Sequence, residues 1–198
     1  MADKAAARAE ASGATRQRIL EAARHLFTER GYFNTSLQDI RRASGLSIGS
    51  IYHHFSGKEA IARGLFYDTL AFVEGDMRAI DANYASARDR CYHVIRRLFE
   101  TTEEAPEVME YVLYFKHREV LPEEKPICSS RPFELIKGII GEGMEAGEIR
   151  PMDEVLASAA LLGMPVRMVQ LRLEGVIDRP LTELLAETWE CAWRSVAA

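Results

Sequence analysis

The polar side chains of residues 36–55, SLQDIRRASGLSIGSIYHHF, are the group in this chain best suited to recognition chemistry. The segment predicts two short helices with Gly45 at the break, because glycine readily adopts the left-handed conformation that ends a helix. Two helices joined by a tight turn form a helix-turn-helix, whose second helix enters the DNA major groove. Such binding needs hydrogen-bonding and charged groups rather than catalytic residues. DNA recognition is therefore the first hypothesis.

Both ends of this motif carry residues that could hold DNA phosphates. A helix N-terminus presents free amides and a partial positive charge, which places Thr35 and Ser36 against a phosphate. Lys58 lies in a Ser-x-x-Glu capping box and would add a positive charge at the start of the next helix. Arg41 and Arg42 are either phosphate contacts or surface charges, and the sequence leaves both readings open.

The predicted recognition helix is poor in side chains that read bases. Ile51 and Phe55 lie four residues apart and should face the core. The helix has no Arg, Asn or Gln, so strong bidentate base contacts are unavailable. DNA shape, and arginines of the first helix or tail (Arg8, Arg16, Arg18), must supply the remaining specificity. The residues of this helix expected at the DNA are Ser47, Ile48, Gly49, Ser50, Tyr52 and His53.

Two of these residues have alternative interpretations. Tyr52 could be a packing residue only. His53 and His54 could suggest a metal ligand or a pH switch, but adjacent residues point to different faces of a helix. We therefore expect no metal and no cofactor.

Charge is distributed unevenly along the chain. Residues 1–60 carry nine Lys/Arg and six Asp/Glu, whereas residues 61–198 carry sixteen and twenty-four. The whole chain of 198 residues has a net charge of −5 and is 47% apolar, enough to bury a core. A basic head on an acidic body fits a DNA-binding domain joined to a domain that avoids DNA.

Targeting and redox signals are weak. No run approaches about 18 consecutive apolar residues, and the first residues have no apolar signal region. Cys91, Cys128 and Cys191 lie far apart without metal-ligand spacing, which suits a reducing cytoplasm. A redox sensor at Cys128, in a loop-like stretch, is the alternative to three ordinary thiols. The expected location is the cytoplasm, without membrane contact.

Helical periodicity runs through almost the whole chain, and no strand alternation is visible. The chain should be all-α with about nine helices, the first starting near Thr15. Pro165 lies inside the penultimate helix, where it removes a hydrogen bond and predicts a kink. The expected helices span residues 15–30, 36–44, 47–55, 56 to beyond 70, 85–101, 106–117, 133–146, 153–173 and 181–196. The expected domains are a flexible tail over 1–13, a helix-turn-helix domain over 14–60, and a ligand-binding and dimerisation domain over 61–198.

Two ungapped stretches, ILEAARHLFTERGYFNTSLQDI and ASGLSIGSIYHHFSGKEAI, carry aromatic, glycine and charged residues at specific spacings. These positions are Phe27, Gly31, Tyr32, Thr35, Tyr52, His54, Phe55, Lys58 and Glu59. On them, Thr15 to about Leu70 resembles the N-terminal domain of the tetracycline-repressor (TetR) family of bacterial regulators. The match covers a little over a quarter of the chain. One departure is Arg41, where the family often carries Ala. The resemblance implies phosphate contacts for Tyr52 and Lys58.

A single helix-turn-helix makes few base contacts, so a two-fold dimer on a palindromic DNA operator is expected. Residues 155–173 have too wide an apolar surface for one exposed helix. The resemblance implies that the two C-terminal helices of each copy form a four-helix dimer interface. The residues expected there are Leu161, Met168, Leu171, Leu185, Trp189 and Trp193.

The middle of the chain should then bind a small-molecule effector. It is rich in aromatic and Met residues, which line apolar cavities but equally often fill a core. His93, Arg96, His117 or Arg118 could orient a polar group of the effector. The expected ligand residues are Phe66, Tyr92, His93, Phe99, Tyr111, Tyr114, Phe115, His117, Met144, Met164 and Met168.

These expectations combine into a homodimeric repressor that a small apolar or amphipathic ligand releases from its operator. A ligand-dependent activator is one alternative, and a protein–protein adaptor that reuses the fold without DNA is another. An enzyme is not expected, because no nucleophile–base constellation, phosphate loop or metal-ligand spacing is visible.

Overall fold

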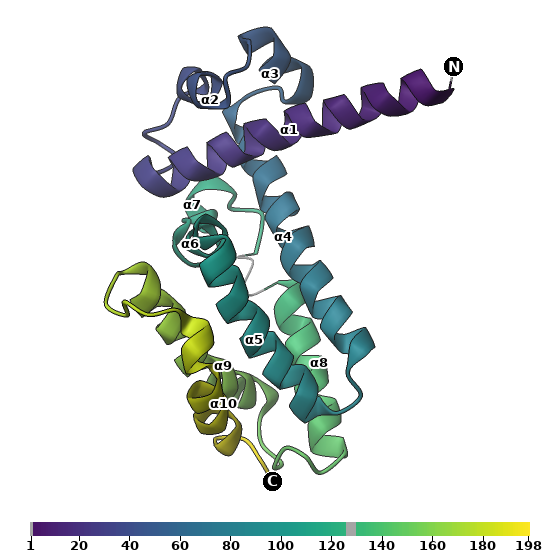
Figure 1. The fold of residues 1–198 in the computed structure, drawn as a ribbon, viewed down its shortest axis with the longest axis vertical. Helices are drawn as coiled ribbons and strands as arrows, with labels where there is room; N and C mark the ends of the chain where they lie inside the picture. Colours follow the sequence, from purple (N-terminus) through teal and green to yellow (C-terminus); the bar gives the residue numbers. More distant parts are fainter. Residues whose placement is uncertain (1, 126–129) are drawn as a thin grey trace. The chain divides into compact units, whose positions relative to one another are not determined.

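The computed structural model of the chain describes residues 2–125 and 130–198, with side chains described from residue 9 onwards. In this part of the chain the fold is all-helical, as predicted, with ten α-helices and one 3₁₀-helix (Figure 1). The helices form two compact units. Unit 1 comprises the described parts of Met1–Thr69 and Tyr114–Lys125, and unit 2 those of Leu70–Leu113 and Pro126–Ala198.

Unit 1 is built around the first helix. Its elements are α1 (Ala2–Arg30), α2 (Leu37–Ser44), α3 (Ile48–His54), the first part of α4 (Lys58–Asn83) and α7 (His117–Val120). Ile19 and Leu26 of α1, Ile40 of α2 and Ile51 of α3 are all buried in its interior. Burial of these apolar side chains holds the short helices α2 and α3 against α1.

The start of α1 corrects the prediction that this helix begins near Thr15. The helix extends back to Ala2, so the predicted tail over residues 1–13 is helical from its second residue. This stretch, ADKAAARAEASGA, is rich in Ala, which has the strongest intrinsic preference for helix. It lacks the apolar periodicity on which the prediction relied, and its described side chains, at residues 9–14, are all exposed.

Local capping explains the boundaries of α2 and α3. Ser36 and Asp39 form the predicted capping box at the start of α2, and Gly45 ends that helix with a φ of 66°. At α3, the Ser47 hydroxyl accepts a hydrogen bond from the amide of Ser50, as expected for an N-cap. The helix-turn-helix therefore forms where the sequence predicts it.

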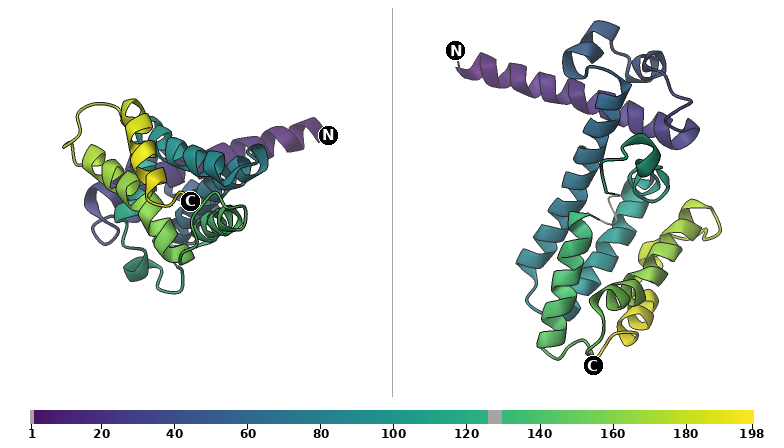
Figure 2. Two further views of the ribbon diagram at one scale, coloured as in Figure 1. Left: turned by 90° about the horizontal axis from the view of Figure 1, so that it is seen from below. Right: turned by 180° about the vertical axis from the view of Figure 1, so that it is seen from behind.

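Unit 2 is a bundle of helices (Figure 2). They are the rest of α4, α5 (Ala87–Glu104), α6 (Pro106–Tyr114), α8 (Arg131–Glu145), α9 (Glu154–Leu173), η2 (Leu181–Leu184) and α10 (Leu185–Arg194). Helix α5 packs against α8, α9 and α10, and its Ile95 and Phe99 are fully buried in the core. The helix predicted over 106–117 ends at Tyr114, and the one predicted over 181–196 begins as a 3₁₀ turn.

Ion pairs link the helices of unit 2. Arg90 of α5 is 8% exposed and pairs with Asp81 of α4 at 2.8 Å and with Glu142 of α8 at 2.7 Å. Arg172, near the end of α9, donates two hydrogen bonds to Glu103 of α5, both 3.0 Å long. Because the Arg90 side chain itself is only 9% exposed, loss of its two partners would leave a buried charge uncompensated, so these pairs tie α5 to α4 and α8.

Helix α9 stands out by its composition. Its most apolar 18-residue window has a mean hydropathy of 1.3, and 28% of that window is buried. By length and composition alone it is the one helix in the described part of the chain that could cross a membrane. An apolar helix that packs on one side and is open on the other is equally typical of a subunit interface.

Candidate DNA interface and ligand cavity

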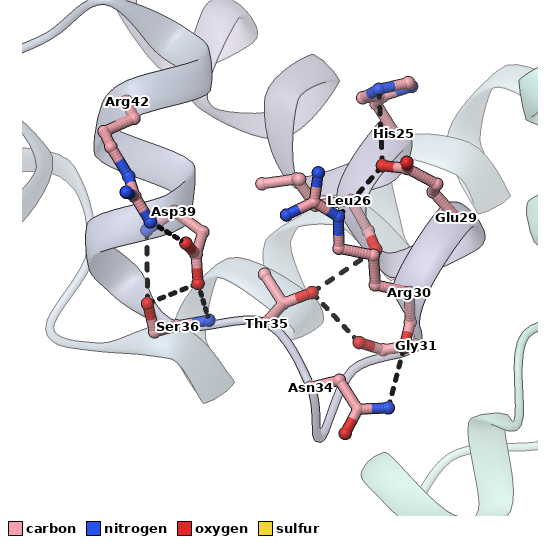
Figure 3. Close-up of polar contacts among 10 residues, drawn as sticks. All are labelled: His25, Leu26, Glu29, Arg30, Gly31, Asn34, Thr35, Ser36, Asp39 and Arg42. Carbon is pink, nitrogen blue, oxygen red and sulfur yellow. Dashed lines mark hydrogen bonds and ion pairs between the residues drawn. The ribbon is translucent and has the colours of Figure 1, made fainter.

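Thr35 is a structural residue of the turn between α1 and α2. Its hydroxyl donates to the carbonyl of Gly31 at 2.9 Å and lies 3.3 Å from that of Leu26 (Figure 3). Its amide donates to the carbonyl of Tyr32 at 3.2 Å, and the residue is only 2% exposed. The phosphate contact predicted for Thr35 therefore finds no free donor there, because both of its donors are used inside unit 1.

Ser36 begins α2 and remains exposed, but its polar groups are also engaged. Its amide donates to Asp39 at 2.9 Å and its hydroxyl at 2.5 Å, and Arg42 pairs with the same carboxylate (Figure 3). Hydrogen bonds from the Ser36 hydroxyl and amide, with help from Arg42, lower the pKa of Asp39 to about 2. A DNA phosphate at the N-terminus of α2 would therefore lie next to the Asp39 carboxylate, whose negative charge is paired with Arg42.

Lys58 binds the same turn from the other side. Its ammonium donates to the carbonyl of Tyr32 at 2.9 Å and to that of Thr35 at 2.8 Å, and lies 4.1 Å from the centre of the Tyr32 ring. Burial lowers the pKa of Lys58. An ammonium has three N–H donors, so one remains for a phosphate. No local sequence pattern predicts this contact, because it joins residues 23 and 26 positions apart.

The outer face of α3 presents the predicted residues. Tyr52 is 55% exposed and His53 is exposed, while Ile51 is fully buried and Phe55 nearly so. Gly49 and Ser47 are also exposed, and Ile48 and Ser50 are half-buried. With more than half of its surface open, Tyr52 is not a core residue, which disfavours the reading that it only packs.

The arginines expected near DNA are largely held by unit 1 itself. Arg18 donates to the carbonyl of Ser44 at 2.7 Å, and Arg41 to the side chain of Gln38 at 2.9 Å. Arg16 lies 3.5 Å from Asp68 and stacks over the ring of Phe55. The side chain of Arg8 lies outside the described residues.

Unit 2 contains an apolar cavity of about 370 Å³. Its lining residues come from five helices, α4, α5, α6, α8 and α9. The only charged side chains on its described wall are Asp76 and Arg97, and the hydroxyl of Ser158 donates back to the carbonyl of Glu154 at 2.7 Å. Such a wall suits an apolar ligand or the apolar tail of a larger one. The cavity is lined by Phe72, Val73, Asp76, Met77, Val94, Arg97, Leu98, Thr101, Val108, Met109, Val112, Leu113, Pro132, Phe133, Ile136, Val155, Ser158, Ala159, Leu162, Gly163 and Val166.

None of the residues predicted as ligand contacts lines this cavity. Phe99 and Tyr111 are fully buried core residues, Tyr92 packs edge-on against Trp189, and His93 stacks on Tyr84 at 3.7 Å. Of the remaining ones, Phe66, Tyr114, Phe115 and His117 belong to unit 1, Met144 and Met168 pack against the core of unit 2, and Met164 is exposed. Val, Leu and Ile make up 10 of its 21 lining residues, and a prediction based on aromatic and Met residues leaves them out. Of that aromatic and Met population, Phe72, Met77, Met109 and Phe133 do line it.

The predicted dimer residues divide into two groups. Leu161 is 1% exposed and Trp189 is 7% exposed, so both face the core of their own chain and leave little surface for a partner. Their burial disfavours the predicted contact with a second copy, because the side of α9 and α10 that packs on α5 cannot be identified from periodicity in so apolar a segment. The others, Met168, Leu171, Leu185 and Trp193, are half-buried.

The cysteines show no reactive arrangement in the described part of the chain. Burial raises the pKa of the Cys91 thiol to about 12, which makes it inert, and Cys191 is exposed. Cys128, the possible redox residue, lies outside the described residues. Among the residues that are described, no group of His, Cys, Asp or Glu could hold a metal ion.

Comparison with known proteins gives short matches to the N-terminal region and longer matches that extend beyond it. Residues 19–65 match the family model described as "Bacterial regulatory proteins, tetR family". The chain is 43% identical over 51 residues to the HTH-type transcriptional regulator UidR of Escherichia coli K12, which covers 26% of each protein. The alignment thus spans about a quarter of the length of this first curated relative.

Longer matches extend beyond the helix-turn-helix. The HTH-type transcriptional repressor KstR2 of Mycobacterium tuberculosis H37Rv is 26% identical over 141 residues, 69% of this chain and 70% of the relative. The structure of the transcriptional regulator FadR of Bacillus subtilis in complex with stearoyl-CoA superposes with a TM-score of 0.75 at 22% identity, covering 90% of this chain and 98% of FadR. This last likeness shows a shared fold.

Proposed function

We propose that this chain, whose residues 19–65 match the model of the tetR family of bacterial regulatory proteins, is a homodimeric repressor that a small amphipathic ligand releases from a palindromic DNA operator. The observation that carries the proposal is the presence, in one chain, of an exposed recognition helix and an apolar cavity in a different unit. Such a regulator acts in the cytoplasm, where its DNA is.

The proposed DNA contacts are the exposed face of α3 and the start of α2. Tyr52 and His53 would meet the DNA first, followed by Ser47, Ile48, Gly49 and Ser50. Ser36, Arg41 and the remaining N–H of Lys58 would contact the backbone. Because these contacts are mostly to phosphates, operator binding should weaken steeply as salt is raised.

Dimerisation would use the open side of α9 together with α10. Leu156, Ala160, Met164 and Leu171 recur along α9 at helical spacing, and Leu156 and Met164 are exposed. Half-buried Leu185 and Trp193 extend this apolar surface onto α10. A second copy would cover a helix that is otherwise far too apolar for water, and would double the contacts with DNA.

The cavity suggests the class of effector. Its apolar wall suits an alkyl or acyl chain, and FadR of Bacillus subtilis, which shares this fold, was solved with stearoyl-CoA. We therefore propose an acyl compound as the effector. Two chain segments could transmit its binding: α4 and α6 both line the cavity, while α4 begins at Lys58 and α6 continues into Tyr114–Lys125 of unit 1. The ligand can weaken DNA binding only as far as it prefers the conformation that fits DNA less well.

The test is selection of bound sequences from fragmented DNA of the source genome, followed by fluorescence anisotropy on the enriched site. A palindromic site that Tyr52→Ala binds at least about tenfold more weakly, and that acyl-CoA releases, is expected. Failure to enrich any DNA would favour the adaptor alternative. Binding that the ligand strengthens would favour the activator.

A further inference from the structure

A second hollow, of about 280 Å³ and polar rather than apolar, lies between α4 and α5 of unit 2. Among its lining residues are Tyr84, His93, Arg96 and Glu100. Asp76 and Arg97 line both this polar hollow and the apolar cavity. The Asp76–Arg97 ion pair therefore stands between a space suited to an alkyl chain and a space suited to polar groups.

Arg97 is held at this boundary by three contacts. Its Nε donates to Asp76 at 2.8 Å, its Nη1 donates to Glu104 at 3.0 Å, and its guanidinium lies over the ring of Phe72 at 5.6 Å. It is the one basic residue on the described wall of the apolar cavity. A ligand with its tail in the cavity would therefore find one guanidinium, already paired with Asp76 and Glu104, next to its polar end.

The two carboxylates on Arg97 differ in how easily they can be replaced. The Asp76 side chain is 27% exposed, whereas that of Glu104 is 63% exposed. A solvent-exposed ion pair contributes little to stability, so an acidic ligand can take the place of Glu104 at small cost. Asp76 would meanwhile keep the guanidinium oriented.

The polar hollow offers room and partners for more of a headgroup. Arg96 pairs with Glu100 at 2.7 Å, and its side chain is 48% exposed, so this pair is also exchangeable. Burial and the neighbouring Arg96 lower the pKa of His93. At neutral pH, the His93 ring is therefore a neutral hydrogen-bonding group, and the positive charges are those of the arginines.

We infer that the effector is an amphiphile with an acidic headgroup, whose tail fills the apolar cavity and whose carboxylate or phosphate pairs with Arg97 and extends into the polar hollow. The inference rests on the proposed function for the existence of an effector, and it adds the charge of that effector and the residue that selects it. Asp76 and Glu100, the two carboxylates that line the hollow, oppose an anion there and set the upper limit of its affinity.

The experiment compares three probes with the same alkyl chain by isothermal titration calorimetry: dodecanoate, dodecanol and dodecanoyl-CoA. The full-length protein should bind the acidic probes at least about tenfold more tightly than the alcohol, because a charge-assisted hydrogen bond is stronger than a neutral one. Arg97→Met should remove this preference and change the affinity for dodecanol less than about threefold. Asp76→Asn should have the opposite effect and tighten the binding of the acidic probes, because it removes a carboxylate that competes with the probe for Arg97.

Arg78→Met is the matched control, since Arg78 also pairs with a glutamate on α4 but lines neither hollow. It should leave all three affinities unchanged. If dodecanoate binds more tightly than dodecanol, a carboxylate is sufficient for the preference. If only dodecanoyl-CoA binds more tightly than dodecanol, the phosphates of coenzyme A are the acidic groups that Arg97 recognises. If Arg97→Met does not fold, the inference is tested by Asp76→Asn alone, which should bind the acidic probes more tightly than the wild type does.

The inference is overturned if the wild-type protein binds dodecanol as tightly as the acids, or if Arg97→Met weakens all three probes equally. In both cases a ligand-responsive regulator would remain. If none of the probes binds or releases the operator, the acyl effector of the proposed function fails as well.

Discussion

At the scale of single residues, Lys58 joins the start of α4 to the turn that precedes α2. We expect Lys58→Met to lower the free energy of unfolding by about 1–3 kcal/mol, because it removes two charge-assisted hydrogen bonds to half-buried carbonyls. Urea denaturation followed by circular dichroism measures this loss. Lys116→Met is the control, since Lys116 is exposed and pairs only with Glu119 three residues away. Equal stability of the two variants would show that Lys58 serves DNA and not the fold.

Asp39 predicts a pH dependence of stability. Its pKa is about 2 in the folded protein, below its ordinary value, because Ser36 and Arg42 stabilise the ionised form. A lowered pKa contributes stability that is present above the unfolded value and is lost as the pH falls through the folded one. The urea midpoint of the wild type should therefore fall between about pH 4 and pH 2 more steeply than that of Asp39→Asn. Glu123→Gln, at an exposed position, is the control and should keep the wild-type dependence of the urea midpoint on pH. Parallel curves for all three proteins would contradict the role given to Asp39.

Some of the single-residue features could be predicted from the sequence, and others could not. The capping box of Ser36 and Asp39 and the stop at Gly45 were predicted correctly, because each depends on neighbours within four residues. Thr35 was assigned to a phosphate, yet it is buried against α1. Its burial depends on how the chain returns along α1, which no local pattern records.

At the scale of elements, two glycines of α8 predict opposite effects of one substitution. A Cβ at Gly143 would lie 2.7 Å from the Cβ of Ala87 and 2.9 Å from Ile149, whereas one at Gly138 would meet nothing within 4 Å. Gly143→Ala should cost about 1–3 kcal/mol through overpacking where α8 meets α5. Gly138→Ala should gain about 0.5–1 kcal/mol by restricting the unfolded chain within a helix. Chemical denaturation of the pair measures both, and a shift of the same sign for both variants would contradict this packing.

The existence of nearly every element followed from periodicity and caps, but two aspects did not. The extension of α1 back to Ala2 has helix-forming composition without an apolar face, so a search for apolar periodicity missed it. The cavity wall combines residues from five helices, and Val94 or Leu98 looks in sequence like any other core residue. Which apolar side chains surround empty space depends on how all of these helices pack.

At the scale of the whole molecule, α9 predicts the oligomeric state. Met164→Glu places a charge in the middle of the open apolar side of α9 and should convert a dimer into a monomer with much weaker operator binding. Size-exclusion chromatography with light scattering measures the mass. Val176→Glu is the control, because Val176 is 67% exposed and lies in the turn after α9 rather than on the helix. A Met164→Glu protein that stays dimeric would place the interface elsewhere.

The surface of α3 has a consequence for how a set of target genes would change over time. A recognition helix that offers Ser, Tyr and His instead of Arg, Asn or Gln imposes a small penalty on each mismatched base pair, toward the low end of about 1–3 kcal/mol. Operators for such a protein can drift in sequence while keeping their spacing, and new sites can arise near other genes by one or two mutations. The cell would then need many copies of the protein to keep its main operator occupied against these near-matches.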